Sequence, residues 1–457
     1  MHLVRPLLLT CAFLSACRVG QTGLFETCES TEVRESSWES GAPILSGISA
    51  RNVLMISIDT LRRDRIGRYS CERLSPFIDQ LLEQSLVLDN HHSCSSWTLP
   101  SAICVLTGQT PVDLGAFPQV NSKQEVPKIA ETTATLAGQL SQAGLSTLLV
   151  SSNLYISGKS GLDVGYDRVI TKRKPSNILL TTILNELDSF ENADPDKPWF
   201  AHVHLIDPHT PYSPPGSYLS SIDDLPEIPW DLSNADGTRE MNEAWPDLSS
   251  AERSEVGKHL VYRYGAEIRY MNDELETFFA EQESRGTLEN TLVVLWSDHG
   301  EQFWEHGDWG HGISLHAGEN RAIAALSGPG IEAGSWTFPT THTDLAPTIL
   351  GALDLPLPEE WRGAPVGLHD HSRALFAATA PREADVQQSI LLDNHRLLYR
   401  WDGEKLLYNV KDDPHETTDL YRSQPERVAE LWAEFEEELN RLVALFPDKT
   451  PPVDPGP

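Results

Sequence analysis

Four short apolar runs have the length and character of buried β-strands. They cover residues 52–59, 146–152, 199–207 and 290–298. Helical patterns lie between them, such as residues 264–284 and an amphipathic segment, residues 133–144, that Gly144 closes. Strands that are apolar on both faces and alternate with helices are typical of parallel sheets covered on both sides. The pattern predicts an α/β fold with a mostly parallel sheet sandwiched by helices.

The pattern changes after about residue 366 and predicts a small α+β subdomain. Residues 395–410 are typical of a β-hairpin that turns at Asp402-Gly403, and residues 425–446 have the period of an amphipathic helix. We therefore expect a main domain at 51–365, a C-terminal subdomain at 366–446 and a disordered tail at 447–457. Residues 213–256 have no clear period, and we interpret them as an excursion that could act as a lid.

The first residues have the features of an export signal. Arg5 precedes an apolar run, Leu7–Leu14, that is too short to span a bilayer as a mature helix. The sequence LSAC, ending at Cys17, resembles a bacterial lipoprotein signal, which implies cleavage before Cys17 and a lipid on that residue. Residues 18–50 would then be a polar linker. We expect an exported protein, lipid-anchored to a bacterial membrane and facing the periplasm or the cell surface; an ordinary secretory signal is the alternative.

The net charge and the cysteine content indicate which partners the protein could bind and whether disulfides could form. The net charge of -32 repels nucleic acid, so we expect no nucleic-acid partner. Beyond the signal segment the cysteines are Cys28, Cys71, Cys94 and Cys104. An oxidising compartment would allow one or two disulfides, whose pairing the sequence does not decide. Cys104 lies in an apolar run and is expected to be a buried thiol.

Three of the predicted strands end in an aspartate, namely Asp59, Asp207 and Asp298. In open α/β sheets, ligands bind beyond the carboxyl ends of the strands, so these carboxylates are expected at one rim. Acids that merely solubilise loops are the alternative.

Histidines stand beside two of these aspartates. His299 directly follows Asp298, and His306 and His311 come soon after. An adjacent Asp-His pair where a strand becomes a loop can present two ligands to one metal, and this donor set suits zinc, manganese or iron better than calcium. The segment 202–212 adds further histidines: His202, His204, which could be a core residue, and His209, which lies past the strand end.

Thr98, in the segment TLPSAICVLTG (98–108), has two interpretations. Pro100 suits the first turn of a helix, so Thr98 could be the helix cap just ahead of it. A helix N-terminus also attracts anions, and a hydroxyl there with a metal could be a nucleophile toward phosphorus or sulfur. The residues alone leave both open.

From about 51 to 420, the chain resembles the sulfatase family of the alkaline phosphatase superfamily. Residues 52–69 resemble its first motif, in which Asp59 matches a metal ligand, and residues 98–108 resemble its signature. IDPHTPY matches a substrate-side histidine at His209, and SDHGE matches the metal pair Asp298 and His299. Residues 341–350 and 407–420 resemble later structural motifs.

The departures from the family pattern lie at the reactive centre. Sulfatases oxidise a Cys or Ser of the signature to formylglycine, whereas Thr98 stands there and cannot give the aldehyde. Ala102 replaces the signature arginine, Thr60 replaces the second acid of the first motif, and His311 stands where a lysine is common. Phosphodiesterases and phosphoethanolamine transferases of the superfamily use a zinc-bound threonine as nucleophile. The transferases also have a histidine at the same distance after the Asp-His pair at which His311 follows His299 here.

The resemblance implies a metal-dependent ester hydrolase without formylglycine. The divalent metal is expected to be zinc, with manganese or calcium as alternatives, on these ligands: Asp59, Thr98, Asp298 and His299. Thr98, His209 and His311 are expected to be catalytic, or Asp207, His209 and His311 to hold a second metal. The threonine favours a phosphate or phosphonate ester over a sulfate. A phosphoryl transferase and a surface binding lipoprotein that has lost the chemistry are the alternatives.

The lipoprotein signal makes a direct prediction. Replacing Cys17 with Ala should leave an uncleaved precursor or release the protein from membranes, because the lipid acceptor is gone. Membrane fractionation with intact-mass analysis measures both effects. Unchanged processing and unchanged membrane attachment would contradict the predicted signal.

Overall fold

The computed structural model describes residues 45, 48–70, 72–115, 127–220, 225–368, 372–380 and 385–446. The predicted signal segment and tail, Cys17, Cys28 and Cys71 lie outside these residues, as does nearly all of the linker. None of the helices in the described ranges is long and apolar enough to cross a membrane.

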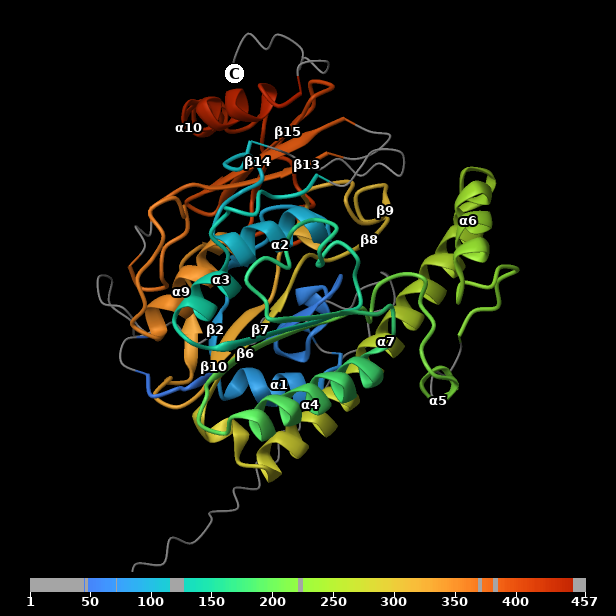
Figure 1. The fold of residues 1–457 in the computed structure, drawn as a ribbon. Coiled ribbons are helices and arrows are strands. Elements are labelled where there is room, and N and C mark those ends of the chain that lie inside the picture. Colours follow the sequence, from blue (N-terminus) through green and yellow to red (C-terminus); the bar gives the residue numbers. More distant parts are fainter. Residues whose placement is uncertain are drawn as a thin grey trace, which may run out of the picture.

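An eight-stranded sheet forms the centre of the main domain (Figure 1). In spatial order its strands are β11 (Gly334–Trp336), β2 (Leu86–Leu88), β10 (Ala324–Ser327), β7 (Thr291–Ser297), β1 (Asn52–Ile58), β6 (Trp199–Leu205), β4 (Ser146–Ser151) and β5 (Arg168–Thr171). The five from β7 to β5 are parallel, whereas β10 runs antiparallel to both of its neighbours. The predicted α/β class is confirmed, and each of the four predicted strands is present.

Helices cover both faces of the sheet because its central strands are apolar on both sides. In β1, Leu54 and Ile56 pack into the core below α1 (Pro76–Glu83), α4 (Ser176–Ala193) and α7 (Ser250–Ser284). Val53 and Met55 point to the opposite face. That face is covered by α2 (Thr98–Thr107), α3 (Leu136–Gln142) and α9 (Leu345–Ala352).

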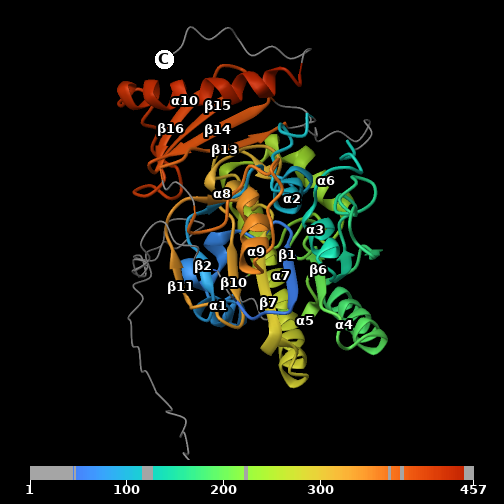
Figure 2. The same ribbon diagram turned by 60° about the vertical axis from the view of Figure 1, so that its left-hand side comes forward.

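The C-terminal subdomain is a four-stranded antiparallel sheet with one covering helix (Figure 2). Its strands are β13 (Leu375–Thr379), β14 (Gln387–Leu392), β15 (His395–Arg400) and β16 (Lys405–Asn409), and the helix is α10 (Pro425–Val443). The predicted hairpin and amphipathic helix are confirmed. Leu431 and Phe435 of α10 are fully buried against this sheet.

The excursion expected at 213–256 contains short helices that precede the long α7. They are α5 (Gly216–Leu219), α6 (Ala235–Ala244) and a 3-10 turn, Trp245–Asp247. Trp245 stacks on Trp304 with ring centroids 3.5 Å apart, which fixes the end of α6 against the hairpin of β8 (Gln302–Phe303) and β9 (Trp309–Gly310). Other short elements include β3 (His91–His92), β12 (Thr340–Thr341) and α8 (Ala317–Asn320).

A disulfide joins Cys94 to Cys104, with Cα atoms 6.7 Å apart. The expectation that Cys104 is a free thiol was therefore wrong. Its apolar neighbours do bury it completely, but a half-cystine is as apolar as a thiol, and the turns of α2 bring Cys104 back to the segment that precedes the helix. The bridge closes the loop that carries Thr98.

Replacing Cys94 and Cys104 together with Ala should lower the free energy of unfolding by about 2–4 kcal/mol, because the unfolded chain loses its cross-link. Chemical denaturation measures this loss. Alkylation without reductant, followed by peptide mass analysis, should leave both cysteines unlabelled in the wild type. Labelling of either one in folded protein would contradict the bridge.

Candidate functional site

Two buried carboxylates meet at the carboxyl ends of neighbouring strands. β1 and β7 pair in parallel up to Ile58 and Ser297, so the next residues, Asp59 and Asp298, lie side by side. Both are fully buried. Asp298 Oδ1 accepts hydrogen bonds from the backbone N–H groups of Thr60 (3.0 Å) and His299 (2.8 Å). One oxygen of Asp298 is thus held by the chain.

Three buried polar atoms at this point have no hydrogen-bond partner within the described residues. They are Asp59 Oδ1, Asp298 Oδ2 and His299 Nε2. His299 Nε2 lies 3.4 Å from Asp298 Oδ2 and 3.8 Å from Asp59 Oδ1. His299 Nδ1–H donates to the carbonyl of Gly300 (2.8 Å), which leaves a lone pair on Nε2. Two carboxylate oxygens and an imidazole lone pair around one point fit a divalent cation.

His204 also belongs to this centre. From the sequence alone it could have been an ordinary core residue. One ligand-type atom each from Asp59, His204 and Asp298 lies within 4.8 Å of the others. However, His204 Nε2 is 3.1 Å from Asp59 Oδ2 and donates to it. Ser57 Oγ lies 2.8 Å from His204 Nδ1 and 2.8 Å from His202 Nε2. This chain of side chains holds the second oxygen of Asp59 in place, so His204 orients the carboxylate.

Thr98 does not cap a helix. It is the first residue of α2, the N-cap is Trp97, and no side chain caps that end. Instead Thr98 Oγ1 accepts a hydrogen bond from Asn153 Nδ2 (3.2 Å), and its hydroxyl is close enough to Asp298 to act against the rise in the pKa of that carboxyl. Of the two interpretations, the capping role was wrong because the helix begins one residue earlier than Pro100 alone indicates.

Asn153 is a residue of the site that was not predicted from the sequence. It lies two residues beyond the end of β4, and its Nδ2 donates to Asp59 Oδ2 (2.8 Å) as well as to Thr98. The same argument from strand ends that selected the aspartates would have found it. Its amide links the threonine hydroxyl to the carboxylate pair.

Two further histidines border the centre. The ring of His311 lies 4.7 Å from that of His299 and 4.9 Å from that of His209, measured between centroids. His311 Nδ1–H donates to Glu301 (2.9 Å), whose other oxygen accepts from Tyr212. Glu301 is fully buried and was not predicted, although it follows the Asp-His pair closely. It fixes the imidazole of His311 with Nε2 turned away from the carboxylate.

Asp207 lies outside this cluster. Its Oδ2 accepts from both the backbone N–H (2.7 Å) and the hydroxyl (2.6 Å) of Ser176, at the start of α4. The structure therefore does not bring Asp207 together with His209 and His311. Strand β6 ends in a loop that turns the aspartate toward α4, whereas His209 continues to the rim.

The environment shifts the pKa values of the site in opposite directions. Burial and the charge of Asp59 raise the pKa of Asp298, against the two backbone N–H groups. Burial would also raise the pKa of Asp59, but His209 and the hydrogen bond from His204 lower it below its usual value. Burial lowers the pKa of His209. It would lower that of His311 too, but the hydrogen bond and charge of Glu301 raise it.

Comparison with known proteins places this arrangement in a family. The family model described as Sulfatase matches residues 51–355. The choline-sulfatase of Rhizobium meliloti is 23% identical over 67% of this chain and 68% of its own length. The arylsulfatase of Clostridium perfringens is 20% identical over 82% of this chain and 90% of its own length.

Solved structures share the fold at low identity. One, determined in complex with its substrate D-glucosamine-2-N,6-O-disulfate, superposes with a TM-score of 0.70 at 17% identity, covering 88% of this chain and 99% of that one. A phosphonate monoester hydrolase from Silicibacter pomeroyi gives a TM-score of 0.68 at 18% identity, covering 88% and 96%. The match to the family model spans the strands and the loops that carry the site, and this chain belongs to the sulfatase family.

Proposed function

We propose that this protein is a metal-dependent ester hydrolase that cleaves a phosphate or phosphonate ester with Thr98 as its nucleophile. The observation that carries the proposal is the environment of the Thr98 hydroxyl, which accepts a hydrogen bond from Asn153, lies close to Asp298 and caps no helix. A hydroxyl used only for helix stability would face the backbone N–H groups of its own first turn.

The donor atoms support a divalent cation at the carboxylate pair. Asp59 Oδ1, Asp298 Oδ2 and His299 Nε2 would hold it, with Thr98 Oγ1 beside them. Two carboxylates with an imidazole favour zinc or manganese over calcium, and we propose zinc. When bound, the cation would neutralise the carboxylates and act as a Lewis acid toward the ester.

Side chains of this protein can carry out the cleavage of the ester bond. The Thr98 hydroxyl loses its proton to water and its oxygen forms a bond to phosphorus while the ester oxygen leaves; the threonine oxygen takes up a proton again when the intermediate is hydrolysed. His311 would protonate the leaving oxygen, since Glu301 keeps its pKa high. His209, whose pKa is low, would take a proton from the water that later frees Thr98. The pKa of His311 is raised and that of His209 is lowered, which suits His311 as the acid and His209 as the base.

Thr98 favours phosphorus over sulfate for a chemical reason. Its Cβ carries a methyl group, so oxidation would give a ketone, and the hydrated aldehyde used by sulfatases cannot form. Ala102, at the position of the signature arginine, is fully buried in α2 and offers no charge to such an aldehyde. The phosphonate monoester hydrolase that shares this fold is compatible with the proposal. We further propose that the protein is exported and lipid-anchored.

Replacing Thr98 with Ala should lower turnover by orders of magnitude, because it removes the covalent step. Thr98→Ser should retain part of the activity. Kinetics on a panel of phosphate, phosphonate and sulfate esters measures both. The matched control is Thr107→Ala, which removes a hydroxyl from the other end of α2, bonded there to the carbonyl of Ile103. A folded Thr98→Ala variant that turns over at the wild-type rate would rule out the proposed nucleophile.

Replacing Asp298 with Ala should remove the metal and the activity together, because the site loses one of its two buried carboxylates. Elemental analysis of the purified protein, alongside kinetics, measures both losses. Asp308→Ala is the control, since that carboxylate is exposed on the following loop. Active wild-type protein that holds calcium or no metal would contradict the assignment, as would a metal-loaded and active Asp298→Ala variant.

A further inference from the structure

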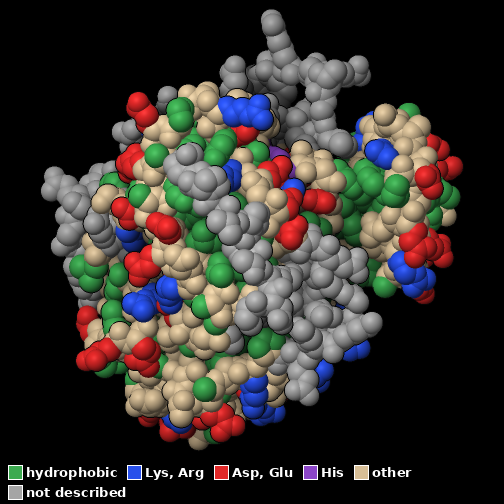
Figure 3. Space-filling view, turned by 90° about the horizontal axis from the view of Figure 1, so that it is seen from above, with side chains coloured by type: hydrophobic (Ala, Val, Ile, Leu, Met, Phe, Trp, Pro, Cys, Tyr) green, Lys and Arg blue, Asp and Glu red, His purple; other side chains and the backbone are tan. Residues whose placement is uncertain are grey.

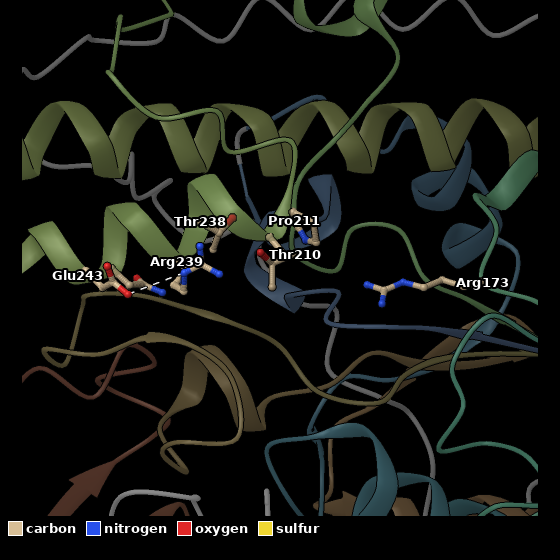
Figure 4. A pocket seen from close by; sticks show the side chains of 8 residues that line it. Arg173, Thr210, Pro211, Thr238, Arg239 and Glu243 are labelled. Atoms are coloured by element: carbon tan, nitrogen blue, oxygen red, sulfur yellow. Dashed lines mark ion pairs between the residues drawn. The ribbon is translucent and has the colours of Figure 1, made fainter. Parts of the chain in front are cut away.

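A cavity of about 520 Å³ lies between α6 and the loop that follows His209 (Figure 4). Its lining is Arg173, Thr210, Pro211, Ala235, Thr238, Arg239, Asn242 and Glu243. The residues from α6 recur at helical spacing, so one face of that helix is turned to the cavity. Its opposite face is anchored by Met241, which is fully buried in the core. Figure 3 shows the region of α6 as a lobe beside the main body.

The walls of this cavity are tied to the reactive residues on two sides. Thr210 directly follows His209 and accepts a hydrogen bond from its Nδ1. On the other side, Arg173 precedes Lys174, whose backbone N–H and carbonyl both bond to the hydroxyl of Ser152 at 3.1 Å. Ser152 is the neighbour of Asn153, which contacts Thr98. Two walls of the cavity are therefore continuous in sequence with residues of the site, one through His209 and the other through Ser152 and Asn153.

Asp207 has a role in this arrangement. Its bonds to Ser176 join the end of β6 to the start of α4, and hence the segment of Arg173 to the loop of Thr210. The carboxylate thus holds two walls of the cavity together.

The charges on the walls leave one cation in excess. Arg239 pairs with Asp236 (2.9 Å) and lies 3.8 Å from a carboxylate oxygen of Glu243, all within α6. Arg173 is exposed, has no ion pair or hydrogen bond to another described side chain, and extends toward Thr210 (Figure 4). Thr210, Thr238 and Asn242 add neutral hydrogen-bonding groups. Such a lining suits a polar, negatively charged molecule.

We propose that this cavity is the subsite for the leaving group and that Arg173 binds an anionic substituent on it, such as a carboxylate. The inference rests on the proposed ester hydrolysis, because it is the bond cleaved at Thr98 that defines the leaving group. The proposed subsite consists of residues outside the reactive centre, so an experiment can refute the subsite without refuting the proposed hydrolysis.

The test compares two esters of one acid that differ by a single carboxylate. They are 4-nitrophenyl and 3-carboxy-4-nitrophenyl methylphosphonate, with the matching sulfates and phosphates as second sets. In Arg173→Ala, the ratio of kcat/KM for the carboxylated ester to that for the plain ester should fall about 5- to 20-fold, and further in Arg173→Glu. Lys172→Ala, which removes the same charge from the adjacent exposed residue, should keep the wild-type ratio.

A ratio that is unchanged in Arg173→Ala, while the wild type cleaves both esters, would overturn the subsite and leave the hydrolase intact. Cleavage of no ester by the wild type would instead overturn the proposed function. Calorimetric binding of the product phenols then still tests the cavity: 5-hydroxy-2-nitrobenzoate should bind the wild type more tightly than Arg173→Ala, and 4-nitrophenol should not discriminate. Equal affinity of the carboxylated phenol for both proteins would refute the subsite.

Discussion

Two carboxylates of like charge are buried beside each other where β1 and β7 end, and this is the constraint on which the site depends. Burial, together with their mutual repulsion, raises the pKa of Asp298. The chain holds one oxygen of each, through Asn153 and His204 on Asp59 and through two backbone N–H groups on Asp298. The other oxygen of each faces the lone pair of His299. A pair arranged in this way is stable when a cation lies between the free oxygens.

The surrounding layers keep this pair rigid. Burial lowers the pKa of His202 to about 3, so it is neutral and can relay hydrogen bonds. Tyr166 bonds to His202, and Ser57 links His202 to His204, which holds Asp59. This relay runs across the sheet between β1 and β6, below the site. Rigid strands therefore position the two carboxylates, while His209 and His311 lie on loops.

The sequence predicted the strand ends well because their signal is local. An apolar run followed by an acid needs only its own residues, and parallel pairing then brings Asp59 and Asp298 together. The prediction failed for residues whose role depends on partners that are distant in the chain. Asp207 has the same local signal, yet Ser176 draws it to α4. Cys104 has an apolar neighbourhood that suits a thiol and a half-cystine equally. Glu301 acquires its role only through His311 and Tyr212.

As the proposed nucleophile, the Thr98 oxygen forms a covalent bond to the transferred group during turnover. Acid quenching of the enzyme in the first turnovers, followed by peptide mass mapping, tests it most directly. If Thr98 is the nucleophile, the peptide containing Thr98 carries the added mass of the transferred group, and fragmentation assigns this mass to the threonine. Turnover with an unmodified Thr98 peptide, or with the added mass on another residue, would contradict the account.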